Sequence, residues 1–269
     1  MSGLTFRLNT YPDERLDLSP LIPSRLASLP LTDILALVVG TTKRQLKVGD
    51  FFAVSGQSGD TVTIQGGSEH LDFVGARLDR GTLILDGDAG AYAGRKMTGG
   101  ELHIRGRAGA WLGSGLSGGL ITVKGSAGDQ VGSMRPGDKF GMTGGIVHVE
   151  GNIGDRVGEK MRRGTIIARG TAGTHAGSRM LGGTIWAEQG FGPGPGTLLR
   201  RGTLIGPAVE QMLPTFADSG KHDLVILRVL SRYLSATLGP LAPSPLSGRA
   251  HKFSGDLATI GKGEILIVS

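Results

Sequence analysis

With 269 residues, the chain is long enough for one large domain or two small ones. Its 29 Lys and Arg outnumber its 23 Asp and Glu, and the net charge of +6 permits an acidic partner without identifying one. It has no cysteine, which excludes disulfides and thiol chemistry. It also has no signal-peptide pattern and no run of about 18 apolar residues, so we expect a soluble, cytoplasmic protein without a membrane segment.

Residues 1–58 are predicted to form an N-terminal cap. We expect a strand at Leu4–Leu8 and a helix around Arg25–Val38, although Pro30 is unfavourable inside a helix. A cap is required because the repeats that follow leave the ends of their stack open.

The central segment is organised by a glycine that returns every 19 residues, with one longer step of 26. These marker glycines are Gly81, Gly100, Gly119, Gly145, Gly164, Gly183 and Gly202. Counting from each marker, glycines recur at positions six, nine and thirteen in most repeats, and Met or Leu recurs at position sixteen. A repeat this short cannot bury its own apolar face and must stack on copies of itself. We therefore predict that residues 59–206 form a solenoid of about seven coils.

An alternation of apolar and polar residues follows each marker and predicts a strand with one face turned inward. The apolar residues at positions two and four are Leu83/Leu85, Leu102/Ile104, Ile121/Val123, Val147/Val149, Ile166/Ala168 and Ile185/Ala187. Position eight is small in most repeats, as at Ala89 and Ala108, and Met97 and its equivalents at position sixteen are predicted to fill the core.

Two outward positions of each strand indicate how the coils stack and what lies outside them. Position five is charged in the first six repeats, with Asp86, Arg105, Lys124, Glu150, Arg169 and Glu188. Stacking the coils makes four of the five neighbouring pairs opposite in charge, as a parallel arrangement predicts. Position three carries Ile84, His103, Thr122, His148, Ile167, Trp186 and Ile205. This face is too apolar for open water, so we expect another element or another chain to cover it.

The step of 26 contains a seven-residue insertion, Ser133 to Lys139. In a solenoid, an insertion leaves the coil as a loop without disturbing the neighbouring coils. Loops of this kind often carry contacts to partners.

Residues 207–269 are predicted to close the other end of the stack. Residues 221–238 have apolar clusters at helical spacing and predict an amphipathic helix, which is suited to cover the apolar face of the solenoid. A proline-rich link over residues 239–245 leads to a final strand at Glu264–Val268.

Motifs that resemble catalytic or ligand sites fit the repeat better than they fit a site. Residues 115–119 match G-x-S-x-G, but Ser117 precedes a predicted strand, whereas a nucleophile elbow is followed by a helix. Residues 113–118 match a dinucleotide fingerprint, but no helix opens there. His103 and His148 lie two coils apart, roughly 10 Å by strand spacing, and are predicted to be surface or interface residues rather than ligands of one metal. We therefore expect no catalytic residue, metal or cofactor in this chain.

Basic residues are the remaining functional signal, because several share repeat positions at one corner of the coil. Lys96, Lys160 and Arg179 all occupy position fifteen, and stacking would align them. The candidate residues are Arg80, Arg95, Lys96, Lys160, Arg162, Arg163, Arg179, Arg200 and Arg201. They predict either a solvated face or a site for a polyanion or an acidic partner. Nucleic acid is disfavoured, because no aromatic stacking platform is evident beside the charge.

The repeat of Gly100–Gly113, with its glycines at positions zero, six, nine and thirteen, resembles the Gly-rich β-helix of two families. One is the C-terminal domain of the large subunit of glutamate synthase. The other is the C-subunit of formylmethanofuran dehydrogenase, with its counterpart in the formyltransferase/hydrolase complex of methylotrophic bacteria. The segments at residues 47–56, 253–256 and 261–265 resemble the C-subunit family, and this similarity covers nearly the whole chain.

The resemblance implies an all-β fold, a right-handed parallel β-helix with short α/β caps. It also implies that the chain is a non-catalytic subunit of a hetero-oligomer, without nucleic-acid or membrane partners. In the dehydrogenase, the partners carry a molybdenum or tungsten pterin and iron–sulfur centres. In the bacterial complex, a formyltransferase subunit moves the formyl group from formyl-tetrahydromethanopterin to methylofuran, and an amidohydrolase-like subunit releases formate. We favour the bacterial complex, with the C-subunit of a formylmethanofuran dehydrogenase or a glutamate synthase-type spacer as the alternatives. The basic residues would then hold the carrier's polyglutamate tail.

Overall fold

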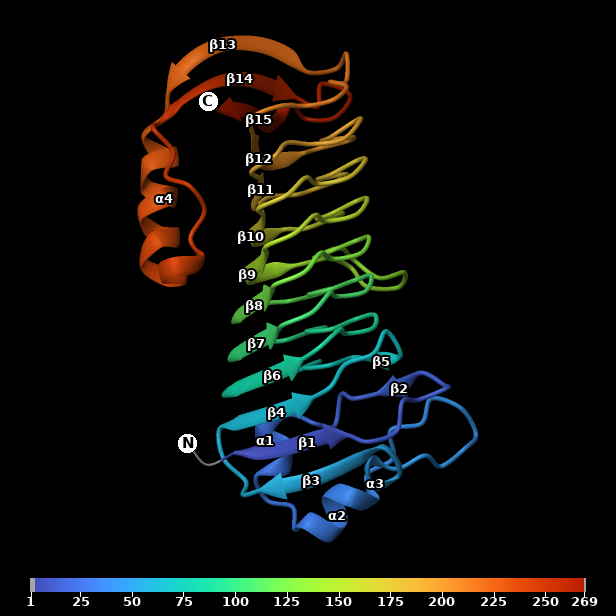
Figure 1. Cartoon of the computed structure of the whole chain (residues 1–269). Helices are drawn as coiled ribbons and strands as arrows, with labels where there is room; N and C mark the ends of the chain where they lie inside the picture. The colour runs from blue at the N-terminus through green and yellow to red at the C-terminus, as the bar shows by residue number, and fades with distance from the viewer. Residues whose placement is uncertain (1–2, 269) are drawn as a thin grey trace.

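The repeats fold as stacked coils, each of which adds one strand to a shared sheet, in a computed structural model that describes residues 3–268 (Figure 1). Successive strands pair in parallel. In the order of the stack they are β4 (Thr61–Gln65), β6 (Thr82–Asp86), β7 (Glu101–Ile104), β8 (Leu120–Val123), β9 (Thr143–Val149), β10 (Arg163–Ala168), β11 (Thr184–Ala187) and β12 (Arg201–Gly206). The regular secondary structure is thus mostly strand, with few helices, and the all-β prediction is confirmed.

The register of these strands follows the repeat. Leu83 pairs with Leu102, and Leu102 pairs with Ile121; all three side chains are fully buried. The predicted inward positions are therefore correct. A second line of contacts joins the coils at position eight, where parallel bridges link Ala89 to Ala108 and continue upward through Phe191 to Val209. Small residues allow the opposite walls of each coil to approach at this line.

The outward charges at position five form some of the predicted pairs. Arg105 contacts Asp86 at 3.5 Å, and Arg169 contacts Glu188 at 3.9 Å. Each pair is partly exposed, so each contributes only a few tenths of a kcal/mol to about 1 kcal/mol to stability.

The N-terminal segment closes the lower end of the stack. β1 (Leu4–Leu8) is confirmed as a strand and pairs in parallel with β4 and antiparallel with β3 (Phe52–Gly56). Short elements complete the cap: β2 (Leu16–Asp17), α1 (Pro23–Leu26), α2 (Leu31–Ala36), α3 (Val48–Phe51) and β5 (Leu71–Asp72). The single helix expected around Arg25–Val38 is wrong. Pro30 is the N-cap of α2 and separates it from α1, because proline lacks the N–H that a helix interior needs.

The C-terminal segment extends the same sheet at the upper end. β15 (Lys262–Val268) pairs in parallel with β12, and β14 (Arg249–Gly255) and β13 (Ala217–Asp223) follow in antiparallel order. The last strand was predicted from the sequence, whereas β13 and β14 were not. The predicted helix begins at Val225 rather than at residue 221, because residues 221–223 pair with β14. The domain divisions at residues 58 and 206 stay a prediction.

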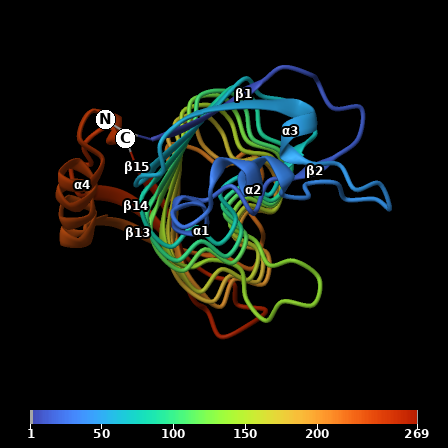
Figure 2. The same cartoon turned by 90° about the horizontal axis from the view of Figure 1, so that it is seen from below.

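Helix α4 (Val225–Leu238) covers the upper part of the outward face, as predicted, and it is followed by a short 3-10 turn at Gly239–Leu241 (Figures 1 and 2). Its buried residues Leu227, Leu234 and Leu238 pack in one cluster with position-three side chains such as Ile167 and Trp186. The apolar outward face is therefore a second, smaller core between the sheet and the helix.

His148 lies on this outward face and is fully buried, so of the two predicted places, at the surface or in an interface, the surface is excluded. Neither ring nitrogen has a hydrogen-bond partner among the described residues. Burial, with a smaller contribution from the nearby Arg169 guanidinium, lowers the pKa of His148 to about 4. The imidazole is consequently neutral in the folded protein over the ordinary range of pH.

Acid should destabilise the fold through His148. The ordinary pKa of 6.5 is higher than the value of about 4 in the folded state, so the unfolded chain binds more protons between these limits and stability falls as the pH falls through them. We expect a loss of about 2 kcal/mol in the free energy of unfolding between pH 7 and pH 5. Urea unfolding at both pH values should show this loss in the native chain and much less of it in His148→Ile. Isoleucine already occupies the same repeat position at Ile167 and Ile205. The same loss in both proteins would disprove the assignment.

Candidate functional site

The corner of each coil after its third glycine places the predicted basic side chains in line. Lys96, Lys160 and Arg179 occupy the same left-handed backbone conformation, with φ of 53°, 52° and 53°. Non-glycine residues adopt this conformation rarely, so its recurrence marks a bend that is repeated along the stack. Each of these three residues is therefore held at the same edge of the stack by the backbone itself.

Three of the predicted residues line one pocket of about 410 Å³ at this edge. Lys160, Arg179 and Arg200 come from successive coils, and Lys139 joins them from the insertion loop. The remaining lining residues are Leu181, Leu198 and Thr259. We call this set the basic pocket. Of its four cations, only Arg179 has an ion-pair partner among residues 3–268.

The insertion loop neutralises two of the predicted basic residues, Arg95 and Lys96. Asp138 contacts both Arg95 and Lys96 at 3.2 Å. Partial burial alone would raise the pKa of Asp138, but the hydrogen bonds from Lys96 and Arg95 hold it below its ordinary value. Arg95 and Lys96 thus already hold a carboxylate, whereas the cations of the basic pocket remain largely uncompensated.

The other predicted residues are not part of the pocket lining. Arg80 contacts its neighbour Asp79 at 3.7 Å. The Arg162 guanidinium lies 5.1 Å from the ring centre of Phe140. Phe140 directly follows Lys139, which lines the pocket. Arg163 and Arg201 are exposed at the first positions of β10 and β12. Three of the nine predicted basic residues therefore share one pocket, and the other six lie outside its lining.

An aromatic stack that was not predicted from the sequence lies at another bend of the coil. The rings of Phe73 and Tyr92 stack at 5.0 Å, and those of Tyr92 and Trp111 stack at 5.2 Å. The Arg135 guanidinium of the insertion loop lies 5.4 Å from the Tyr92 ring centre. These rings stack on one another at a different bend from the basic pocket, so the prediction that nucleic acid is disfavoured stays a prediction. The signal was present, because these three residues are spaced by 19 in the sequence.

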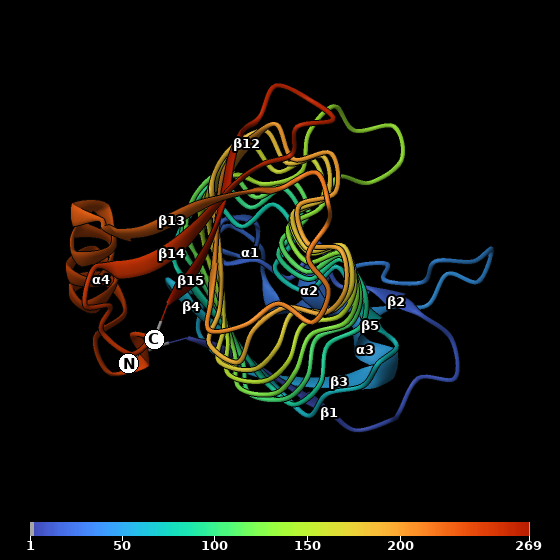
Figure 3. The ribbon, with the colours of Figure 1, turned by 90° about the horizontal axis from the view of Figure 1, so that it is seen from above.

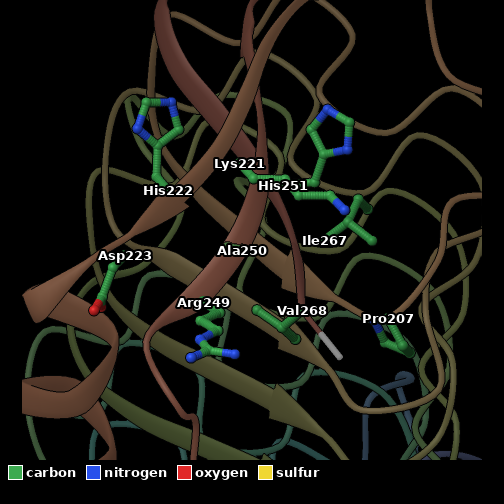
Figure 4. A pocket seen from close by; sticks show the side chains of 9 residues that line it. All are labelled: Pro207, Lys221, His222, Asp223, Arg249, Ala250, His251, Ile267 and Val268. Carbon is green, nitrogen blue, oxygen red and sulfur yellow. The ribbon is translucent and has the colours of Figure 1, made fainter.

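A second cavity of about 620 Å³ lies beside β13 and β14 and holds two imidazoles, His222 and His251 (Figure 4). The two rings point to different sides, and the Nε2 atom of His251 contacts Asp218 at 2.6 Å.

Ser117 of the G-x-S-x-G motif is followed by β8 rather than by a helix. Among residues 3–268, no group of three or more His, Asp or Glu side chains is placed to hold a metal ion, and no helix is long and apolar enough to cross a membrane.

Comparison with known proteins gives close matches over the full length of the chain. No family model matches. The chain is 49% identical over 263 residues to the C-subunit of the formyltransferase/hydrolase complex Fhc of Methylorubrum extorquens, covering 98% of each sequence. Its structure is similar to a chain in the crystal structure of the formyltransferase/hydrolase complex FhcABCD of the same organism, solved in complex with methylofuran. The TM-score is 0.92 at 40% sequence identity, with 98% of this chain and 99% of that chain covered.

Proposed function

Because this chain belongs to the C-subunit family of the formyltransferase/hydrolase complex, we propose that it is a non-catalytic structural subunit of such a complex in one-carbon metabolism. The complex transfers a formyl group from formyl-tetrahydromethanopterin to methylofuran and then releases it as formate. The carriers bind to the partner subunits, a formyltransferase and an amidohydrolase-like protein, in a cytoplasmic hetero-oligomer.

The observation that carries this proposal is the identity of 49% over 98% of both chains, accompanied by a structural match at a TM-score of 0.92. The match includes both ends of the chain as well as the repeats. It therefore favours a free-standing subunit of this family over a spacer domain that shares only the glycine repeat.

The stack of coils is, in this proposal, the right-handed parallel β-helix of the family. The parallel register of β4 to β12 and the second line of bridges at position eight support it. A stack of this kind resists bending because each coil is bonded to two neighbours, which suits a scaffold that holds other subunits at fixed positions.

The basic pocket is assigned a role in holding the carboxylate-rich tail of the furan carrier. Lys139, Lys160 and Arg200 present uncompensated cations beside an apolar rim of Leu181 and Leu198. Charges at this degree of exposure attract a polyanion over roughly one Debye length, about 10 Å at 0.1 M salt, and hold it without rigid geometry. A tail held in this way remains free to move between two active sites.

The proposal is tested by isolating the complex from the native host through a tag on this chain. We expect a formyltransferase and an amidohydrolase-like subunit in stoichiometric amounts, with formyl transfer to methylofuran and formate release in the purified material. Iron–sulfur or pterin subunits would point instead to a dehydrogenase. Glutamate synthase subunits, or the chain alone, would overturn the proposal.

A further inference from the structure

Helix α4 is apolar on its exposed side as well as on the side that packs against the sheet. Val225, Ile226, Val229 and Tyr233 are exposed at 64%, 59%, 51% and 53% of their surface. We call these four residues the outer face of α4. A helix that only covers a protein core normally carries polar residues on its outer side. Four large apolar side chains in one patch, each more than half exposed, therefore indicate a contact surface.

The outer face of α4 continues into a groove between the helix and the sheet. This groove has a volume of about 200 Å³ and joins Ile226, Val229 and Tyr233 to Thr203 and Ile205 of β12. A neighbouring side chain entering the groove would touch the helix and the sheet together. Tyrosine beside such a groove is typical of the buried centre of protein interfaces.

The charges on α4 indicate what kind of surface it binds. The helix has two arginines and no acidic residue. Arg228 already contacts Asp223, whereas Arg232 has no ion-pair partner among residues 3–268. A two-fold contact between copies of this chain would place the same patch against itself and bring like charges together. The complement is therefore a different protein, apolar at its centre and carrying carboxylates at its rim.

We propose that the outer face of α4 docks another subunit of the formyltransferase/hydrolase complex through an apolar patch with an acidic rim. This inference rests on the proposed function, because that function supplies the other subunits. The insertion loop projects from a different side of the stack than α4 (Figures 2 and 3). A subunit docked on α4 thus leaves the loop and the basic pocket accessible to the carrier.

The experiment is the tagged purification of the complex with Val229→Glu/Tyr233→Glu in place of the native chain. We expect at least a tenfold loss of one partner subunit relative to the native chain. Ser235→Gln, an uncharged change at an exposed position on the flank of the same helix, should retain that subunit. Equal recovery with the double variant and the native chain would overturn the docking site while leaving the proposed function intact. Failure of the native chain itself to recover partners would instead overturn the proposed function.

Two further measurements separate a lost contact from a damaged fold or a homodimer. Circular dichroism of the isolated double variant should match the native chain. Because the chain has no cysteine, Val229→Cys provides a single thiol whose maleimide labelling should be fast in the isolated chain and at least tenfold slower in the complex. Equal labelling in both would overturn the inference. Slow labelling of Val229→Cys in the isolated chain, together with a dimer mass by light scattering, would assign the outer face of α4 to a second copy of this chain. That result would also overturn the inference.

Discussion

Gly100→Ala is expected to lower the free energy of unfolding by about 3 kcal/mol, because it adds a methyl group where two coils approach closely. Gly100 is a marker glycine with φ of +71°. A Cβ atom there would lie 2.6 Å from the carbonyl oxygen of Gly81 and 2.9 Å from the carbonyl carbon of Arg80. Both contacts are to backbone of the coil below, so relief requires the two coils to separate. In a chain of this size, the midpoint of thermal unfolding should fall by about 6–12 °C.

Gly137→Ala is the matched control for this substitution. Gly137 also has a left-handed backbone, with φ of +92°, but its Cβ would meet no atom within 4 Å. It therefore tests backbone strain without the clash, and we expect a loss of about 1 kcal/mol. Similar losses in the two variants, measured by urea unfolding, would show that the repeat glycines are required only for their backbone conformation and not for close stacking.

The stack was predictable from the sequence because its constraints are local and repeated. Close approach of one coil to the next demands glycine at the markers, and burial demands apolar residues at positions two and four. Leu83 and Leu102 obey both the period of two along the strand and the period of 19 between coils. Few other folds satisfy both periods at once.

The ends of the stack were predicted less well because pairing between distant residues determines them. Residues 217–223 are all exposed or half-exposed and show no apolar alternation, yet they form β13 because β14 offers its backbone edge. Pairing with β14 likewise takes residues 221–223 out of the predicted helix. The sequence alone does not show which edge is available to a polar segment.

The basic pocket was predicted in part, and the difference follows from the repeat. Lys160 and Arg179 share a repeat position, so their alignment could be predicted. Lys139, Thr259 and the neutralising Asp138 come from outside the repeat, and only the fold brings them to the corner. The aromatic stack shows the reverse case, because its residues carry the period of 19 and the signal was overlooked.

Replacing Lys139, Lys160 and Arg200 together with serine is expected to raise the KM of the assembled complex for methylofuran roughly tenfold at low salt. Each exposed contact with a carboxylate is worth about 0.2–1 kcal/mol, and a total near 1.4 kcal/mol corresponds to a factor of ten. The dependence of KM on ionic strength should weaken in the same variant, because fewer screened charges act on the tail. Arg179 is left in place, because its removal would leave Glu159 without this ion pair.

Two further variants decide whether the pocket itself is responsible. Asp138→Asn should lower KM, because it releases Arg95 and Lys96 to bind carboxylates of the carrier. Replacing Lys43, Lys221 and Arg249 with serine removes the same charge from exposed positions outside the pocket and should change KM little. Equal increases in the two triple variants would assign the effect to net charge. An unchanged KM in the pocket variant would exclude binding of the carrier's tail in the basic pocket. Loss of a partner subunit from that variant would instead identify the pocket as a contact between subunits, because the same cations suit an acidic protein surface.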